Sequence, residues 1–479
     1  MKRPITDFGS NINEYIEKLF GKDAVDKYTE LTLLDPVQFI RVNTAKTTPR
    51  DLRDTLLEKY EIETSLVENF DFALKVEKGG QYIGKTVEHI CGEYYIQSFS
   101  SMLPPLVLNP NEHDLVLDLC ASPGSKSTEL SNLMNNKGTL ILNEIQMDRV
   151  RTLVFNIDRM TVINAGVLHN RGEWLGRIYN EYFDKVLVDA PCSGLGILQK
   201  KSEIGNWWTK EKLSGLAELQ YKLLVSAIRM AKTGGEIVYS TCTLTVEENE
   251  EVINKILEKY PVELLPITLP LKTDPGMVNY EEKSFHPSLG MGVRLNPWEF
   301  NSEGFFIAKL RKTSPTEAAK KQEFPKSRTL FAGMNSLKSN FLYLSEIFGI
   351  PEEIFHNFRY IIRANDIFFV DKGWDDNNLD LFVRIGNKFG SFDKNGRIIL
   401  HTQAAQILAP YFTNSIYDIQ SLDELKAYLG GGTFRCKAEG RGQIVIRNRD
   451  KILGAAQLNE GTVKSRFPRG KRTQEIIIR

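Results

Sequence analysis

Short apolar runs alternate with longer amphipathic stretches between residues 114 and 310, and this alternation constrains the fold more than any other feature. Buried strands separated by helices predict a mostly parallel sheet that helices cover on both faces. The expected strands are 114–119, 139–143, 162–168, 185–189, 236–240 and a late strand 304–310. The expected helices are 125–134, 148–159, 210–231 and 246–259. The sequence therefore predicts an α/β fold for residues 111–312.

A chain of 479 residues is too long for a single core, so further domains are expected around this unit. Residues 1–110 combine helical patterns with a strand at 39–43, which predicts a small α+β N-terminal domain. Residues 313–328 are polar, include prolines and have no apolar periodicity, as is typical of a linker. Residues 329–479 return to short β-like runs, which predict a β-rich C-terminal region.

Composition and cysteine spacing exclude several classes of protein. The chain is 42% hydrophobic and 25% charged, as in ordinary soluble proteins. No apolar run approaches the roughly 18 residues of a membrane span, and the start lacks the apolar core of a signal peptide. Five widely spaced cysteines form neither a disulfide framework nor a zinc pattern. We therefore expect a cytoplasmic protein without a membrane segment or a metal.

The charge distribution points to the C-terminal end as a binding surface. The net charge is zero, but residues 431–479 hold twelve Lys and Arg against four Asp and Glu. The stretch 464–472 interleaves cations with Phe467, a pattern that can neutralise phosphates and stack on a base. A solvated basic tail would look the same, so both interpretations stay open.

Two cysteines follow predicted strands, where open α/β sheets place their chemistry. Cys192 lies in the motif Asp189-Ala190-Pro191-Cys192-Ser193-Gly194, and Cys242 lies in Ser240-Thr241-Cys242-Thr243. A thiolate is nucleophilic enough to add to an electron-poor pyrimidine, and the carboxylate of Asp189 can bind the amino edge of a cytosine. Two thiols in one crevice predict covalent chemistry on a base. The acids at 247–250 are interpreted as a helix-start device, and the other three cysteines as packing residues.

A loop of small residues follows the first predicted strand. Within Asp118–Ser127, the backbone can approach a ligand closely, yet the spacing matches neither a Walker loop nor a GxGxxG turn. Glu144 ends the next strand, where an acid commonly binds a ribose hydroxyl pair. Together they favour a nucleoside-type cofactor over a simple tight turn. The candidate cofactor-binding residues are Ala121, Ser122, Pro123, Gly124, Ser125, Lys126, Ser127, Glu144 and Asp189.

In combination, these motifs resemble those of the RNA cytosine-5 methyltransferases of the Sun/nucleolar-protein type. The segments Glu93–Ser98 and Gly304–Phe306 extend the resemblance, and 40–44 resembles the RNA-contacting strand of that family. Size and C-terminal extension are most similar to the bacterial subfamily that methylates small-subunit ribosomal RNA and carries a PUA-like C-terminal domain. The resemblance implies a Rossmann-like domain that uses S-adenosyl-L-methionine (SAM), an RNA partner or the small ribosomal subunit, and a monomer.

The resemblance also implies roles for the motif residues. The thiolate of Cys242 would add to carbon 6 of the cytosine, Asp189 would bind the ring-nitrogen side, and Cys192 would assist release of the product. Lys126 and the amides of the loop at 121–127 would hold the methionine end of SAM, and Glu144 the ribose. One departure stands out: Arg171 occupies the place of an Asp that helps the family hold the adenosine.

Other functions remain possible at this point. The same chemistry could act on transfer RNA, because the motifs report cytosine and not which RNA supplies it. A non-catalytic RNA-binding ribosome assembly factor would keep the fold without needing both cysteines. A DNA cytosine methyltransferase would use the thiol of the Asp189–Gly194 motif and need no second one. A hydrolase with a cysteine nucleophile would need a histidine near it in sequence, and neither cysteine has one.

Overall fold

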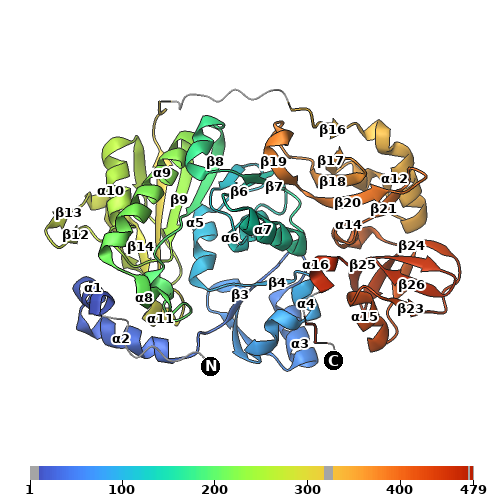
Figure 1. The fold of residues 1–479 in the computed structure, drawn as a ribbon, viewed down its shortest axis with the longest axis horizontal. Coiled ribbons are helices and arrows are strands. Elements are labelled where there is room, and N and C mark those ends of the chain that lie inside the picture. The colour runs from blue at the N-terminus through green and yellow to red at the C-terminus, as the bar shows by residue number, and fades with distance from the viewer. Residues whose placement is uncertain (1–9, 318–326, 473–474, 478–479) are drawn as a thin grey trace.

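The computed structural model describes residues 10–317, 327–472 and 475–477 of the chain. A central α/β region carries an N-terminal region below it and a C-terminal region at its right-hand side (Figure 1). Of the predicted linker 313–328, residues 318–326 lie outside the described residues.

The core of the central region is a large sheet. Its strands are β5 (Leu115–Asp118), β6 (Thr139–Glu144), β7 (Ala165–His169), β8 (Phe183–Asp189), β9 (Ala231–Thr241), β10 (Val262–Leu265), β11 (Asp274–Pro275), β14 (Val293–Leu295) and β15 (Phe305–Lys312). The order β7-β6-β5-β8-β9 is parallel throughout, and β15 then pairs antiparallel with β9. The chain runs from β5 outward in both directions, so a ligand crevice is expected at the carboxyl ends of β5 and β8.

Helices cover both faces of this sheet. They are α5 (Leu103–Leu108), α6 (Ser125–Leu133) and α7 (Met147–Met160) on one face, and α9 (Leu213–Met230) and α10 (Glu250–Lys259) on the other. Successive strand residues serve opposite faces: Leu187 packs with the first set, whereas Val186 and Val188 pack with the second. Both faces are thus apolar, and the predicted α/β fold is confirmed.

The N-terminal region divides into two parts. Its elements are α1 (Ser10–Phe20), α2 (Lys22–Leu33), β1 (Phe39–Val42), α3 (Pro49–Tyr60), β2 (Glu63–Val67), β3 (Phe70–Lys78), α4 (Val87–Ile90) and β4 (Tyr94–Ile96). The four strands form one sheet, in the order β2-β3-β1-β4. Helices α1 and α2 instead pack under the central region, against α8 (Ile204–Trp207) and α11 (Pro297–Phe300) (Figure 1).

The polar side chains of Arg41 in β1 and of Asn43 directly after it point into the protein, and RNA contact by the segment 40–44 stays a prediction. Both side chains are almost completely buried. The guanidinium of Arg41 donates to Thr128 Oγ1 at 2.7 Å, and the amide of Asn43 donates to two backbone carbonyl groups. These polar groups fasten the N-terminal sheet to the central region.

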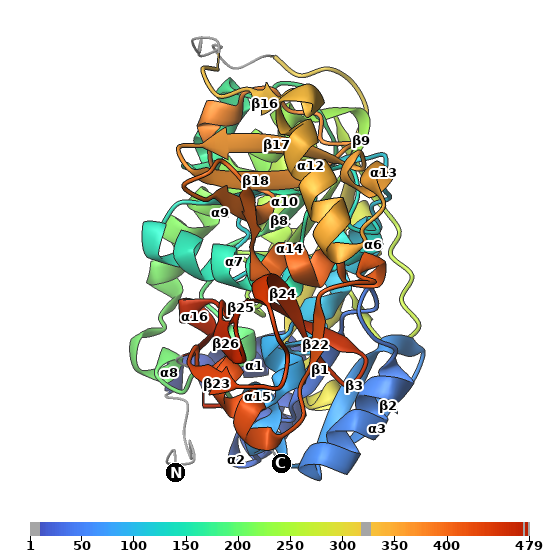
Figure 2. The same ribbon diagram turned by 90° about the vertical axis from the view of Figure 1, so that its right-hand side faces the viewer.

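The C-terminal region contains two five-stranded sheets with α14 between them (Figure 2). The first consists of β16 (Phe331–Ala332), β17 (Phe358–Arg363), β18 (Asp366–Asp371), β20 (Asn387–Phe392) and β21 (Ile398–Leu400). The second consists of β22 (Ile416–Asp418), β23 (Thr433–Arg435), β24 (Arg441–Asn448), β25 (Lys451–Asn459) and β26 (Thr462–Ser465). The helices are α12 (Met334–Phe348), α13 (Glu352–Phe355), α14 (Thr402–Ile407), α15 (Leu422–Leu429) and α16 (Arg469–Arg472). The PUA-like character of this end stays a prediction.

The C-terminal region also completes the central sheet. Strand β19 (Phe382–Ile385) pairs antiparallel with β7 and covers what would otherwise be an open edge (Figure 1). The approach is close at Gly166, where a Cβ atom would lie 2.4 Å from Trp374 and 2.8 Å from Phe382. The sequence pattern did not predict that a strand of the C-terminal region joins the central sheet.

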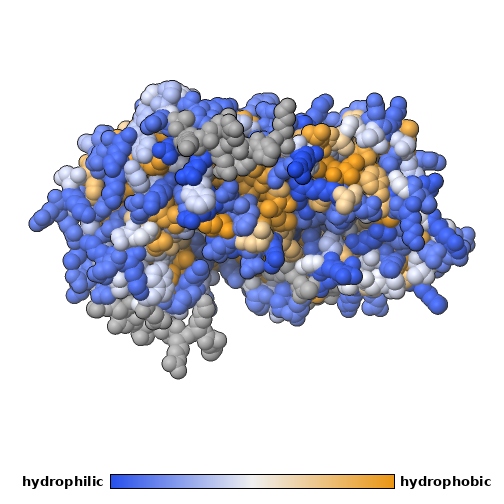
Figure 3. Space-filling view, turned by 45° about the horizontal axis from the view of Figure 1, so that its top comes forward, coloured by the Kyte–Doolittle hydropathy of each residue, from blue (hydrophilic) through white to orange (hydrophobic). Residues whose placement is uncertain are grey.

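One face of the surface shows how polar and apolar residues are distributed. The face in Figure 3 is mostly hydrophilic, with hydrophobic residues gathered near its middle. Within the described ranges, no helix combines the length and apolarity needed to cross a bilayer. A two-stranded hairpin of β12 (Asn279–Tyr280) and β13 (Lys283–Ser284) lies at the left edge of Figure 1.

Candidate active site

A cavity of about 850 Å³ opens where the central parallel strands end. It contains all three predicted catalytic residues, Cys192, Cys242 and Asp189, together with Ser122 and Glu144 from the predicted cofactor set. Residues that the sequence analysis did not name also line it, among them Arg149, Lys201, Trp207, Leu219 and Leu223. The other predicted loop residues, namely Ala121, Pro123, Gly124, Ser125, Lys126 and Ser127, do not line this cavity.

The two motif cysteines lie side by side, with Sγ of Cys192 3.2 Å from Sγ of Cys242. The hydrogen bond to Cys242 raises the pKa of the Cys192 thiol well above its usual range, and burial adds to the effect. Either thiol can donate in this contact, so the two sulfur atoms are close enough to share a proton.

Glu248 ties the two cysteine loops together. This fully buried carboxylate accepts hydrogen bonds from the Ser193 amide at 2.8 Å, from Gln220 Nε2 at 2.9 Å and from Thr245 Oγ1 at 2.7 Å. Ser193 follows Cys192, and Thr245 lies three residues after Cys242. Glu248 therefore fixes one loop relative to the other.

The interpretation of the acids at 247–250 as the first turn of a helix is wrong for Glu247 and Glu248, which precede the helix. Helix α10 begins at Glu250, later than predicted, and Glu250 itself forms a buried ion pair with Arg294. Glu247 accepts a hydrogen bond from the Tyr15 hydroxyl on α1. Sequence reasoning missed Glu248 because its partners come from loops and a helix far from it along the chain.

Asp189 faces the cavity with both carboxylate oxygens engaged. Oδ2 accepts a hydrogen bond from Lys126 Nζ at 2.7 Å, and Oδ1 accepts one from Ser240 Oγ at 2.8 Å. Burial alone would lower the pKa of Lys126, but the carboxylate of Asp189 outweighs it and the pKa is raised. Lys126 is thus a fixed cation that orients Asp189; the expected contact with the methionine end of a cofactor stays a prediction.

Backbone contacts hold the loop between β5 and α6. The Ala121 amide donates to the Asn143 carbonyl at 2.9 Å, and Arg149 Nη2 donates to the Ser122 carbonyl at 2.7 Å. Gly124 has a φ of 106°, which suits glycine, and a Cβ atom there would lie 3.0 Å from Leu153. Helix α6 begins directly afterwards at Ser125. The remaining predicted members of the loop contribute from within it, at Pro123 and Ser127.

Glu144 ends β6 with its carboxylate in the cavity wall. The residue is 3% exposed, and its Oε1 accepts a hydrogen bond from the Gln146 amide at 2.8 Å. Its Oε2 lies 3.4 Å from Arg149. A buried carboxylate beside a tight loop of small residues suits the hydroxyl pair of a ribose, so these residues fit a nucleoside cofactor.

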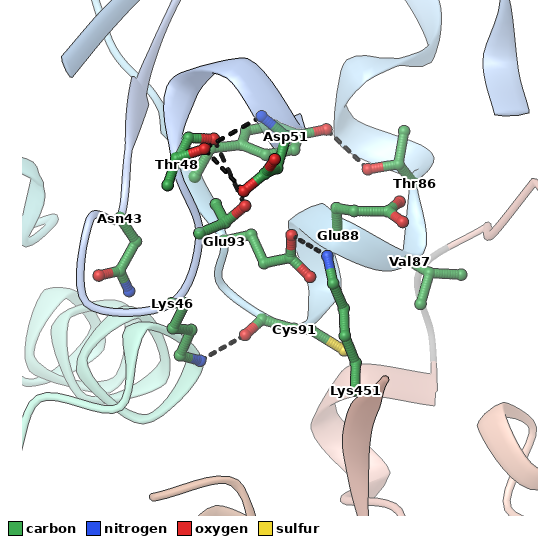
Figure 4. A network of polar contacts seen from close by, with 12 residues as sticks. Asn43, Lys46, Thr48, Asp51, Thr86, Val87, Glu88, Cys91, Glu93 and Lys451 are labelled. Carbon is green, nitrogen blue, oxygen red and sulfur yellow. Dashed lines mark hydrogen bonds and ion pairs between the residues drawn. The ribbon is translucent and has the colours of Figure 1, made fainter. Parts of the chain in front are cut away.

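A second cavity, of about 570 Å³, lies between the N-terminal region and the turn that joins β24 to β25. The ion pair between Lys451 Nζ and Glu93 Oε2, 2.6 Å long, crosses it, and Lys46 donates to the Cys91 carbonyl nearby (Figure 4). It shares no residue with the two cysteine motifs or the loop at 118–127, and it lies at the interface between the two regions. Across the described ranges, no cluster of three His, Cys, Asp or Glu residues could hold a metal ion.

Comparison with known proteins links this geometry to a family. A family model described as "16S rRNA methyltransferase RsmB/F" matches residues 105–311. The ribosomal RNA small subunit methyltransferase F of Vibrio atlanticus is 31% identical over 438 residues, which cover 90% of each chain. A tRNA (cytosine(49)-C(5))-methyltransferase of Pyrococcus abyssi is 34% identical over 62% of this chain and 97% of its own.

Other relatives are matched only in part, and one solved structure shares the fold. This chain spans 39% of a mouse 28S rRNA (cytosine-C(5))-methyltransferase and 37% of a human 28S rRNA (cytosine(4447)-C(5))-methyltransferase. A methyltransferase homologue from Pyrococcus horikoshii superposes with a TM-score of 0.56 at 32% identity, covering 62% of this chain and 93% of the other.

Proposed function

Because the chain belongs to the 16S rRNA methyltransferase RsmB/F family, we propose that it methylates carbon 5 of a cytosine in RNA through a covalent bond from Cys242. The observation that carries this proposal is the sulfur pair at 3.2 Å beside the Lys126–Asp189 ion pair in one cavity. A cysteine that only packs in a core needs no second thiol or ion pair beside it. A nucleophilic cysteine does need neighbouring groups that adjust its reactivity.

The first step forms a bond between Sγ of Cys242 and carbon 6 of the cytosine. The electron pair of the double bond between carbons 5 and 6 then moves onto carbon 5 and toward the ring nitrogen, while the carboxylate of Asp189 holds the base by accepting a hydrogen bond from its 4-amino group. Lys126 and Ser240 hold this carboxylate in place before the reaction, so little reorganisation is needed as charge develops.

The second step transfers the methyl group to carbon 5, and the third restores the ring. SAM supplies an electrophilic methyl group on a sulfonium. The transfer would leave S-adenosylhomocysteine, with the electron pair of the broken bond on its sulfur. A base then takes the proton from carbon 5, and the electron pair of that C–H bond restores the double bond between carbons 5 and 6. The bond from carbon 6 to sulfur breaks, and its electron pair stays on Sγ of Cys242. Cys192 assists this release, since its thiol already contacts the departing sulfur.

The cofactor would lie along the ends of β5, β6 and β7. Glu144 would accept hydrogen bonds from the ribose hydroxyl groups, and the loop from Ala121 to Ser127, which reaches the cavity at Ser122, would offer its backbone to the amino-acid end. The target base must leave its stack to reach Cys242, so a single-stranded or flipped-out cytosine is required.

We further propose small-subunit ribosomal RNA as the substrate. The small-subunit relative matches 90% of this chain, including the C-terminal region, whereas the tRNA relative matches 62%. In our proposal the regions that flank the central domain hold the RNA around the target base. Because this chain and the small-subunit relative match over these regions too, the match favours the same RNA substrate. Transfer RNA remains the second candidate because that relative is covered over 97% of its own length. A monomeric, cytoplasmic enzyme completes the proposal.

Bisulfite sequencing of ribosomal and transfer RNA, from cells with and without this gene, tests the proposal. Loss of one small-subunit cytosine mark in the deletion strain is the expected result. Loss of a transfer-RNA mark would keep the chemistry and overturn the substrate. No change in either RNA would overturn the enzymatic proposal and favour a non-catalytic assembly factor.

A further inference from the structure

The resemblance places Arg171, in the segment after β7, where the family has an acid, and the structure shows where this side chain goes. Arg171 lines the large cavity, but its guanidinium is turned onto the next acidic residue. Nε and Nη2 both contact Oε1 of Glu173, at 2.8 and 2.7 Å. The guanidinium also lies over the Trp174 ring, 4.6 Å from its centroid. The guanidinium of Arg171 is thus paired with Glu173 and Trp174 and does not place a free cation in the cavity.

Glu173 is consequently the acid at this end of the cavity. It lines the same wall as Arg171, and its side chain is 11% exposed, against 52% for Arg171. Both contacts from Arg171 use Oε1, so Oε2 keeps its lone pairs for another donor. An isolated surface ion pair would have both partners in water, and this one has its acid largely covered.

The surroundings of Glu173 suit a flat ring. Gly172 precedes it, and a Cβ atom there would lie 2.7 Å from Leu223, so the backbone runs tight against α9. Ile145, Leu219 and Leu223 give this end of the cavity apolar walls. Glu144, the proposed ribose ligand, ends β6, which is the neighbour of β7. A base attached to that ribose would therefore lie between the apolar walls with its edge toward the residues that follow β7.

We propose that Glu173 recognises the adenine of SAM by accepting a hydrogen bond from its 6-amino group on Oε2. Arg171 and Trp174 act as positioning residues that hold the carboxylate toward the cavity. This inference rests on the proposed function, because it takes SAM as the cofactor. The 6-amino group is the one strong hydrogen-bond donor of an adenine attached to ribose, and a carboxylate is an acceptor without any donor of its own. The acid that the resemblance places at position 171 is thus supplied two residues later, by Glu173.

The test is calorimetric binding of two ligands to the full chain: S-adenosylhomocysteine and its analogue in which hydrogen replaces the 6-amino group. Wild type should bind the first about 10- to 100-fold more tightly, as expected for a hydrogen bond to a charged group. Glu173→Ala should weaken binding of S-adenosylhomocysteine by the same factor and leave the analogue almost unchanged. Glu173→Gln, which keeps the volume, should also lose the preference, because Arg171 would hold the amide oxygen and turn the NH₂ group to the base.

Asp148→Asn provides the matched control. Asp148 is an exposed carboxylate in an ion pair with Arg151, 2.9 Å long, at the start of α7. This variant should keep the preference for the 6-amino group. A preference that survives both Glu173 variants would overturn the assignment of Glu173. If wild type bound neither ligand, the proposed function itself would fail, and the two failures are therefore distinguishable.

Discussion

The two halves of the active-site cavity are built differently. In the half after β8 and β9, buried side chains from distant segments converge on the cysteine loops, with Glu248 and Gln220 at the centre. In the half after β5, β6 and β7, backbone contacts and a tight glycine turn shape the wall, and an exposed arginine ends it. The first half holds two sulfur atoms 3.2 Å apart, and their spacing depends on these buried contacts. The second half is shaped mainly by its backbone, and in our proposal it binds the cofactor with an acid at position 173 instead of 171.

The largest effect should come from the nucleophile in the first half. Cys242→Ala removes the sulfur that we propose attacks carbon 6, so turnover should fall by more than about 10³-fold. Methyl transfer from radiolabelled SAM to RNA measures it. Cys436→Ala removes a free thiol in the C-terminal region and should leave turnover unchanged. Equal losses in both variants would mean that general damage, and not the missing nucleophile, causes the effect.

The second cysteine should give a different defect from the first. Cys192→Ala leaves Cys242 able to attack but removes the thiol that contacts its sulfur at 3.2 Å. A covalent complex with RNA should therefore accumulate, visible as a slower band on a denaturing gel, while single-turnover methylation persists. The double variant Cys192→Ala with Cys242→Ala should form no such band. Normal turnover without a trapped complex would contradict this division of roles.

Glu248→Gln tests whether the first half depends on its buried carboxylate. The amide keeps the size but loses the charge and turns an NH₂ group toward hydrogen-bond donors. We expect the free energy of unfolding to fall by about 2–3 kcal/mol, as for lost hydrogen bonds to a charged group. Adduct formation in the Cys192→Ala background should slow as the loops separate. Glu299→Gln, in a surface ion pair with Lys272, should change neither quantity measurably.

In the second half, Asp118 should make stability depend on pH. Burial raises its pKa from 3.8 to about 7. Between these values the unfolded carboxyl is ionised while the folded one is protonated, so the folded state binds more protons and stability falls as pH rises. Asp118→Asn removes this titration and still accepts the hydrogen bond from Ser127. Chemical denaturation at pH 4.5 and 8 should show the variant gaining about 2–4 kcal/mol relative to wild type. An equal difference at both pH values would contradict the assignment.

The sequence predicted the elements that obey local rules. Short apolar runs between helical patterns indicate buried strands from the local sequence alone. The strands that end at Asp118, Glu144 and Asp189 were therefore predicted close to their observed ends. The motif residues that follow these strands converge because parallel strands present their carboxyl ends at one edge. These are properties of neighbouring residues in the sequence.

Contacts between distant segments could not be predicted in this way. Nothing in the neighbouring sequence marks Phe382–Ile385 as an edge strand of the central sheet. Nor does the neighbouring sequence show that Arg41 is buried and donates a hydrogen bond to Thr128 on α6. Glu248 looked like a helix start because an acid before a helix usually is one. Glu173 was passed over since only the turn of the Arg171 side chain reveals which acid faces the cavity. Tertiary packing decided each of these cases.

The smallest effect should come from α2, which supports the first half from outside. The hydroxyl of Tyr28 donates to the Leu195 carbonyl at 2.7 Å, three residues after Cys192, and both residues are buried. Tyr28→Phe keeps the ring and leaves that carbonyl without this donor, so stability should fall by about 1 kcal/mol. Because the Leu195 loop carries Cys192, product release should slow a few-fold while ligand binding in the second half stays constant. Tyr411→Phe, at an exposed site, is the control. A change in S-adenosylhomocysteine affinity in Tyr28→Phe would show that the two halves are mechanically coupled and would break the comparison drawn between them.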